Sequence, residues 1–154
     1  MRKILIAAMV ALLAGATQVQ AQSQGVVVKQ SAFSVKETLD RLEKVFEQKG
    51  IRVFARIDHQ AGANRINKEL APAQVLIFGN PKIGTPLMQS NIVAGLDLPM
   101  KALAYQDDTG KVFLVYNHPG YLNRRHGIKD RNRLAQTVSR ILINLTDQAT
   151  KKQQ

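Results

Sequence analysis

Cysteine and tryptophan are both missing from the 154 residues of this chain, and aromatic residues make up only 5% of it. Without cysteine the protein has no disulfide, no thiol nucleophile and no thiolate metal ligand. A domain of this length can still be held together by its hydrophobic core alone. Acidic residues are also scarce, since 11 Asp and Glu stand against 22 Lys and Arg, for a formal net charge of +11.

Long apolar runs are equally rare, and the one that stands out covers residues 4–14, directly after the basic Arg2 and Lys3. It has about half of the ~20 residues that cross a bilayer, which argues against a retained membrane anchor. No cysteine follows it, so a lipid anchor is excluded, and the modest side chains that end at Ala21 match a signal-peptidase site. We therefore expect a cleaved signal peptide over residues 1–21, export to the bacterial periplasm or the medium, and no transmembrane segment in the mature chain.

The excess of positive charge indicates either an anionic partner or solubility alone. Removal of Arg2 and Lys3 with the signal peptide takes away two positive charges and leaves the mature chain strongly basic. In the cytoplasm such a charge suggests nucleic acid. For an exported domain nucleic acid is not the expected partner, and we expect peripheral contact with anionic lipid, envelope polymer or acidic protein. The alternative is that the charge only keeps the domain soluble.

Periodicity in the first half of the mature chain predicts a strand, a helix and a second strand. Residues 25–31 hold three consecutive valines and are typical of a strand. Ser34 and Glu37 stand at the spacing of a capping box, and apolar residues then recur at helical spacing until Gly50, a natural stop. Alternating apolar residues predict the next strand over residues 51–58.

The second half predicts further strands and a long helix. They are a buried strand at residues 75–78, a short helix opened by Thr85 and Pro86 that runs to about Ser90, a β-hairpin of residues 99–106 and 111–117, and an amphipathic helix from near Asp130 to Ala149. This order predicts an α+β fold, in which a mostly antiparallel sheet carries two amphipathic helices on one face. We expect one domain over residues 26–149, after a short flexible segment at residues 22–25 and before a tail at residues 150–154.

Several short motifs together resemble the domain of unknown function family 302. They are Asp58-His59, the run Phe78-Gly79-Asn80-Pro81-Lys82 with Gly84-Thr85, the run Leu98-Pro99-Met100-Lys101, and Tyr116. The similarity covers nearly the whole mature chain, from about Val26 to Ala149. The resemblance implies a compact α+β domain with a tendency to pair as homodimers, and it implies no established reaction.

Asp58 and His59 form the first candidate site, because they end a predicted strand where functional side chains often project. A carboxylate beside an imidazole is suited to a general base or a metal ligand. Neighbouring residues on a strand point to opposite faces, however, so the two side chains need not meet. The alternative is that Asp58 caps the turn.

The loop that contains Asn80, Lys82 and Thr85 forms the second candidate site. It has the two glycines of a phosphate loop, but Thr85 stands where that motif requires lysine, which excludes nucleotide hydrolysis. Free backbone amides at the start of the helix opened by Pro86, with Lys82 nearby, are suited to hold a carboxylate or another anion. The alternative is a rigid turn in which glycine and proline serve only the backbone.

The third candidate lies on the hairpin. A simple four-residue loop at residues 107–110 would place Lys101 opposite Tyr116 on a largely apolar face. An ammonium beside a phenol on such a face is unusual and suggests function. Two alternatives remain: Lys101 reaches water at the sheet edge, or a bulge at Gly110 separates the two residues.

The three histidines and a basic cluster complete the candidates. His59, His118 and His126 would suit zinc or copper, but they lack the short spacing that metal-binding pairs show. The basic cluster consists of Arg124, Arg125, Lys129, Arg131 and Arg133, and it suits either phosphate-bearing lipid, an acidic partner or plain solvation.

These observations leave three hypotheses of function open. The first is an exported binding module for a small anionic ligand or a metal ion, and the second is an enzyme with Asp58 or His59 as base and Lys101 with Tyr116 stabilising negative charge. The third is a structural or self-association role in the cell envelope. The candidate ligand-binding residues are Asp58, His59, Asn80, Lys82, Thr85, Lys101, Tyr116 and His126. Without a nucleophile, metalloprotease or cofactor motif, the pattern favours binding and identifies no cofactor.

Overall fold

The computed structural model describes residues 25–152, and this part of the chain folds around one five-stranded sheet. The strands are β1 (Val26–Ser31), β2 (Arg52–Asp58), β3 (Ala73–Gly79), β4 (Met100–Gln106) and β5 (Val112–Asn117). The helices are α1 (Val35–Gln48), α2 (His59–Arg65), α3 (Pro81–Ser90), the 3-10 helix η1 (Ile92–Leu96), α4 (Pro119–Arg125) and α5 (Asn132–Thr150). The strand order across the sheet is β1-β5-β4-β3-β2, and every neighbouring pair is antiparallel.

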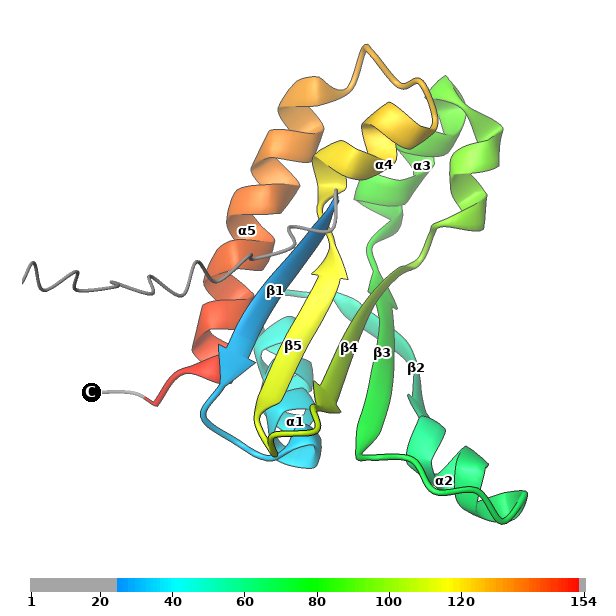
Figure 1. The fold of residues 1–154 in the computed structure, drawn as a ribbon. Coiled ribbons are helices and arrows are strands. Elements are labelled where there is room, and N and C mark those ends of the chain that lie inside the picture. Colours follow the sequence, from blue (N-terminus) through cyan, green and yellow to red (C-terminus); the bar gives the residue numbers. More distant parts are fainter. Residues whose placement is uncertain (1–24, 153–154) are drawn as a thin grey trace, which may run out of the picture.

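Helices cover one face of the sheet, whereas the other face is open in the part of the chain that the structure describes (Figure 1). α1 packs against β3, β4 and β5, α5 packs against β1, and the two helices contact each other. α3 and α4 gather at one end of the sheet, and α2 projects from the opposite end (Figure 1). The predicted α+β fold, with its antiparallel sheet and two helices on one face, is confirmed.

Alternation along the strands separates the core from the open face. Leu76 on β3 and Leu114 on β5 are both 0% exposed, whereas Val28 on β1 is 54% exposed. Side chains along a strand point alternately to its two faces, so one set joins the helices and the other remains uncovered. α1 contributes Leu39, Leu42 and Phe46 to the core, and α5 contributes Leu142, Leu145 and Ala149.

α1 begins and ends at the predicted signals. Ser34 Oγ accepts a hydrogen bond from the backbone N–H of Glu37 at 3.2 Å, which satisfies one of the free donors of the first turn. Gly50 stands after the helix with a φ of 65°, a conformation that side chains other than glycine rarely adopt.

α3 begins at Pro81, earlier than the predicted start at Pro86. Asn80 Oδ1 accepts a hydrogen bond from the backbone N–H of Lys82 at 2.9 Å, so Asn80 is the N-cap and Pro81 opens the helix. Pro86 lies inside the helix, where its missing N–H leaves one carbonyl of the first turn without a helical donor. Asn80 and Thr85 are both suited to capping, and each precedes a proline. The sequence alone therefore offers two possible starts for this helix, and the predicted start at Pro86 is wrong.

Three further short helices were absent from the sequence prediction. α2, η1 and α4 are each capped by a side chain, from Asp58, Asn91 and His118 respectively. Elements of this length are too short to show a hydrophobic period, so capping was the only local signal.

The hairpin register differs by one residue from the prediction. Asp107 Oδ1 accepts a hydrogen bond from the backbone N–H of Lys111 at 2.9 Å, and Gly110 has a φ of 79°. The loop therefore includes Lys111, and Gln106 pairs with Val112. A glycine with positive φ at the end of the turn adds one residue to the loop, which the sequence could not distinguish from the shorter turn.

The predicted signal peptide and nearly all of the predicted flexible segment lie in residues 1–24, outside the described residues. Residues 153–154, in the predicted tail, lie outside them as well. α5 continues to Thr150, one residue past the predicted end of the domain. Between residues 25 and 152, none of the helices combines the length and apolar character that a bilayer crossing requires.

Candidate functional site

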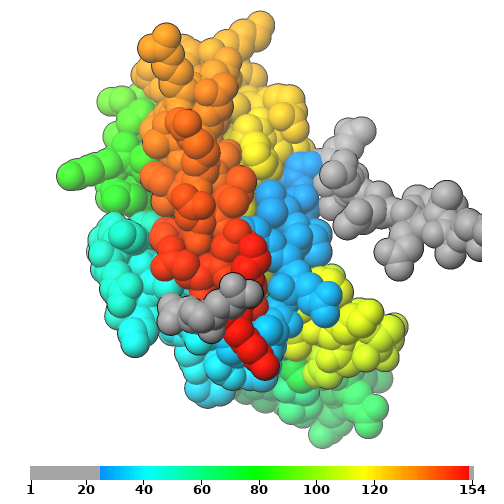
Figure 2. Space-filling view, turned by 90° about the vertical axis from the view of Figure 1, so that its left-hand side faces the viewer, coloured from blue at the N-terminus to red at the C-terminus, as the bar shows by residue number. Residues whose placement is uncertain are grey.

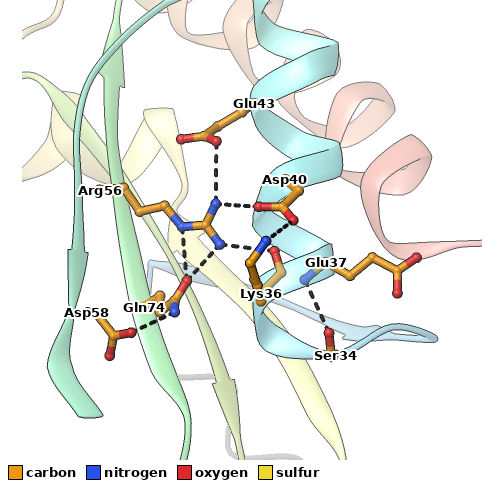
Figure 3. Close-up of polar contacts among 8 residues, drawn as sticks. All are labelled: Ser34, Lys36, Glu37, Asp40, Glu43, Arg56, Asp58 and Gln74. Carbon is orange, nitrogen blue, oxygen red and sulfur yellow. Dashed lines mark hydrogen bonds and ion pairs between the residues drawn. The ribbon is translucent and has the colours of Figure 1, made fainter. Parts of the chain in front are cut away.

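Asp58 and His59 lie where β2 ends and α2 begins. The Asp58 carboxylate accepts hydrogen bonds from the backbone N–H of Ala61 at 2.9 Å and from Gln74 Nε2 at 2.8 Å (Figure 3 draws the latter). The bond from Ala61 holds the pKa of Asp58 below its ordinary value. A carboxylate held in this way is a weak base, so the geometry favours the capping role over general-base catalysis. His59 is exposed on the first turn of α2.

The histidines are spread over the molecule, and His118 and His126 make hydrogen bonds to nearby groups. His118 Nδ1 accepts a hydrogen bond from the backbone N–H of Gly120 at 3.0 Å, and the ring of His126, which is 8% exposed, bonds to Asp97. His59 lies on α2, which projects from the other end of the sheet (Figure 1). Among residues 25–152, no group of three or more His, Asp or Glu side chains is arranged to hold a metal ion.

Lys101 and Tyr116 lie on opposite faces of the sheet, so the predicted pairing of the two side chains is wrong. Tyr116 stands opposite Ala102, and Lys101 stands opposite Ile77. Lys101 is exposed on the open face, whereas Tyr116 is 3% exposed in the core, where burial raises the pKa of its phenol. The cause is the one-residue shift of the hairpin, because such a shift moves a side chain to the other face.

Asp58, His59, Asn80, Lys101 and Tyr116, which come from the three candidate sites, do not converge in one pocket. Asp58 pairs with Gln74 at the start of β3, whereas Asn80 follows Gly79 at the end of that strand. Asp58 and Asn80 therefore lie a strand length apart, since β2 and β3 run antiparallel. The enzyme hypothesis that joined Asp58 or His59 to Lys101 and Tyr116 loses its geometric basis.

The structure forms a different site, an apolar cavity of about 780 Å³ between α5, α3 and the adjoining ends of β3 and β4. Phe78, Met100, Leu122, Leu142 and Leu145 are among its buried lining residues, and Ile83, Leu87, Leu98 and Val138 line it as well. Asn80 and Thr85 of the second candidate site border this cavity, whereas the exposed Lys82 is not among its lining residues. Figure 2 shows α5, in orange to red, between α1 and α3 on one side and α4 and β1 on the other.

Asn123 is a polar group in the wall of the apolar cavity, and sequence reasoning missed it. Its side chain is 4% exposed, and its Oδ1 has no hydrogen-bond partner within the described residues. The Nδ2 atom makes a long contact of 3.4 Å to Asn132 Oδ1. A buried acceptor without a donor costs about 1–3 kcal/mol, so such groups call for a water or a ligand. No motif marks Asn123 in the sequence.

The chemistry of the apolar cavity suits binding and offers little for catalysis. Lys49 is the only titratable side chain among its described lining residues, and no serine, histidine or carboxylate lies there. Other polar side chains around it include Asn80, Thr85 and Asn144. A cavity with apolar walls and a few polar groups is the usual form of a small-molecule site.

Fold and cavity together define a small two-layer α+β domain with an apolar cavity beside α5, and within residues 25–152 nothing covers its second sheet face. The family described as "Domain of unknown function DUF302" matches residues 27–148, so the chain belongs to this family. The crystal structure of an uncharacterised conserved DUF302 protein from Bacillus stearothermophilus is similar, with a TM-score of 0.74 and 20% sequence identity. The match covers 82% of this chain and 99% of that one, and it supports the fold alone.

Curated relatives are longer proteins. A fluoride-specific ion channel, FluC 1, of Brucella suis biovar 1 (strain 1330) is 45% identical over 104 residues, which are 68% of this chain and 41% of that protein. The fluoride-specific ion channel FluC 2 of Brucella melitensis biotype 1 is 45% identical over a stretch of the same length, 38% of its own chain. This chain thus spans about two fifths of the curated relatives that it matches, and their channel activity is a property of those proteins.

Proposed function

We propose that this domain binds a small, largely apolar molecule in the apolar cavity between α3 and α5. The observation that carries the proposal is the cavity itself, whose volume of about 780 Å³ falls in the range of small-molecule sites. The proposal keeps the predicted binding module and replaces its anionic ligand or metal ion with an apolar one.

The lining residues define the ligand class. Each methylene that the ligand buries against side chains such as Phe78, Met100 and Leu142 contributes about 0.8 kcal/mol. The unpaired Oδ1 of Asn123 favours a ligand with one hydroxyl or N–H donor. A fatty alcohol or an apolar ring system with such a group satisfies both requirements.

The test is a fluorescence titration of the purified mature chain with N-phenylnaphthylamine, an uncharged apolar probe with one N–H donor. We expect its fluorescence to rise on binding, and decanol to displace it more effectively than decanoate. Preferential displacement by decanoate would support the anionic ligand instead. An absent signal would overturn the proposal.

A matched pair of variants on α5 locates the binding. Ile141 lines the cavity and is 42% exposed, whereas Ile143 is 41% exposed and is not among the lining residues. We expect Ile141→Trp to weaken probe binding several-fold and Ile143→Trp to leave it unchanged. Val138→Trp, deeper in the cavity, should abolish it. Equal effects of the two isoleucine variants would contradict a site in this cavity, and melting temperatures would show that each variant is folded.

The open sheet face favours a second candidate function, self-association. Along its middle it presents Val28, Val115, Leu103 and Ile77, and Lys101 is the charged residue among them. Two such faces can pack on each other as the sheets of a β-sandwich do. A homodimer formed in this way would cover apolar surface that is exposed in the single chain.

Sedimentation velocity tests the homodimer. We expect the wild type to sediment as a dimer and Val28→Lys, on the open face, to shift it toward the monomer. Ile92→Lys is the control, because Ile92 is an exposed apolar residue on η1, away from the sheet, with 71% exposure. A wild type that stays monomeric at all concentrations would exclude this role.

A further inference from the structure

The basic cluster of the sequence divides into paired and unpaired cations. Arg125 Nε lies 3.3 Å from Asp97 Oδ2, and Arg131 Nη1 lies 3.3 Å from Asp130 Oδ2. Each of these two cations therefore has a carboxylate partner nearby. Arg124, Lys129 and Arg133 make no ion pair with any carboxylate that the structure describes. The unpaired members are therefore the ones available to a ligand.

Two of the unpaired cations, Arg124 and Lys129, border a second cavity of about 810 Å³ between α4, the α4–α5 connection and α5, which we call the basic cavity. Arg124 and Lys129 enter it from α4 and the connection, and α5 adds a third cation, Arg140, which also has no ion-pair partner within residues 25–152. No Asp or Glu is among its described lining residues. The basic cavity lies across α5 from the apolar cavity, and Asn123 and Ala135 border both.

His118 adds a neutral donor to the basic cavity. Its Nδ1 accepts the hydrogen bond from the backbone of Gly120, so in the uncharged ring the proton is on Nε2, which is then a donor. His118 is among the lining residues, and three cations and one N–H donor thus surround the same space.

Gly120 lets the His118 ring pack close to the backbone of α4. A Cβ at this position would lie 3.2 Å from the His118 ring, closer than an ordinary contact, and 3.7 Å from Arg124 Nη1. The lack of a side chain at Gly120 therefore keeps the ring and the guanidinium near each other at the edge of the basic cavity.

We propose that the basic cavity binds a phosphoryl group, carried by a soluble phosphate ester or by a lipid headgroup. A phosphoryl group has three acceptor oxygens and up to two negative charges, which match several cationic donors better than a single carboxylate does. Guanidinium groups such as those of Arg124 and Arg140 are suited to bidentate contacts with it. This inference is independent of the apolar ligand, because none of the three cations of the basic cavity lines the apolar cavity.

The first experiment titrates the mature chain with inorganic phosphate, using isothermal calorimetry and ¹H–¹⁵N correlation spectra. We expect saturable binding and shifts of the amide signals of Gly120 and Gly127, both of which line the basic cavity. Arg140→Gln should weaken binding about tenfold, the effect of one charge-assisted hydrogen bond. Arg133→Gln is the control, because Arg133 is also an exposed arginine of α5 and is not among the lining residues.

Equal weakening by Arg140→Gln and Arg133→Gln would overturn the site, because it would indicate diffuse attraction of anions to a basic surface. Shifts of scattered amide signals without saturation would also overturn the proposed site, because they would indicate an adventitious ion only. Unchanged melting temperatures of the two variants would show that neither result comes from unfolding.

Vesicles distinguish the two sources of the phosphoryl group. We would compare vesicles of phosphatidylcholine alone with an equimolar mixture of phosphatidylcholine and phosphatidic acid. Binding to the mixture that free phosphate displaces and Arg140→Gln abolishes would assign a lipid headgroup. Phosphate binding without vesicle binding would assign a soluble ester. Vesicle binding that neither phosphate nor Arg140→Gln reduces would contradict the proposed site.

Discussion

The guanidinium of Arg56 lies 2.6 Å from Asp40 Oδ1, and this ion pair fastens strand β2 to helix α1 (Figure 3). The same guanidinium donates to Gln74 Oε1 at 2.7 and 2.9 Å and to the carbonyl of Lys36 at 3.0 Å. β2 is at the edge of the sheet, where a backbone ladder holds it on one side only. Arg56 therefore supplies side-chain bonds at an edge that lacks a second neighbouring strand.

Replacement of Arg56 should lower stability measurably. We expect Arg56→Met to reduce the free energy of unfolding by about 1–3 kcal/mol, because it leaves Asp40 Oδ1 and Gln74 Oε1 without the donor that Arg56 supplies. Lys36→Met is the control, since its pair with Asp40 is more exposed, and it should cost less than about 0.5 kcal/mol. Urea denaturation checks both values, and equal losses would contradict the special role of Arg56.

The same contacts predict acid sensitivity. Hydrogen bonds from Lys36 and then Arg56 hold the pKa of Asp40 below its ordinary value of 3.8. The folded state therefore binds fewer protons than the unfolded chain near this pH. The stabilisation that Asp40 contributes is fully present above pH 3.8 and is lost as the pH falls below that value. Asp40→Asn should flatten the decline of melting temperature in this acid range. A wild-type profile without acid loss would contradict the assignment.

Asn123→Leu should stabilise the ligand-free chain. The substitution removes a buried acceptor that has no donor, and we expect a gain of about 1 kcal/mol in the free energy of unfolding. Asn144→Leu, an exposed asparagine that borders the same apolar cavity, should change stability little. Asn123→Leu should also remove any preference of the cavity for decanol over decane. A loss of stability would show that Asn123 is satisfied in the protein.

Paired cysteines test the hairpin register against the shorter loop. Leu103 stands opposite Val115 in the structure, whereas the predicted four-residue loop would place it opposite Leu114. The natural chain has no cysteine, so engineered pairs can be read without interference. Oxidation should link Leu103→Cys with Val115→Cys and leave Leu103→Cys with Leu114→Cys reduced, since those two residues point to opposite faces. Mass spectrometry before and after alkylation distinguishes the two outcomes.

Export and the cleavage site can be tested directly. We expect the full chain, expressed in a Gram-negative host, to reach the periplasm with Gln22 as its first residue. Ala21→Arg should block processing, because the peptidase requires a small residue before the cut. N-terminal sequencing of the periplasmic fraction checks this. Unprocessed protein in the cytoplasm would contradict the signal peptide.

Local patterns were sufficient for much of the fold. Ser34, Gly50 and the helical spacing between them predicted α1. Apolar runs, alternation and the turn signal of the hairpin predicted the strands, because these signals depend on neighbours within a few residues. The two amphipathic stripes then required a sheet to cover, which predicted the α+β layers. The start of α3 was harder to predict, because Pro81 and Pro86 each follow a residue that is suited to capping a helix.

The candidate site could not be predicted in the same way. Lys101 and Tyr116 were placed together by counting from a turn, and one additional loop residue at Lys111 put them on opposite faces. The apolar cavity depends on how α3, α4 and α5 pack over the ends of β3 and β4, and Asn123 matters only because that packing buries it.

By itself, then, the sequence determined what depends on short range: the basic charge, the lack of disulfides, the main helices and strands, and the expectation of export. Tertiary structure alone decided which polar groups are paired, which face is open and where the cavities lie. The physical reason is that burial and hydrogen-bond partners are set by segments far apart in the chain. Arg124 and Arg125 are adjacent in sequence, yet Asp97 neutralises one and leaves the other to line the basic cavity.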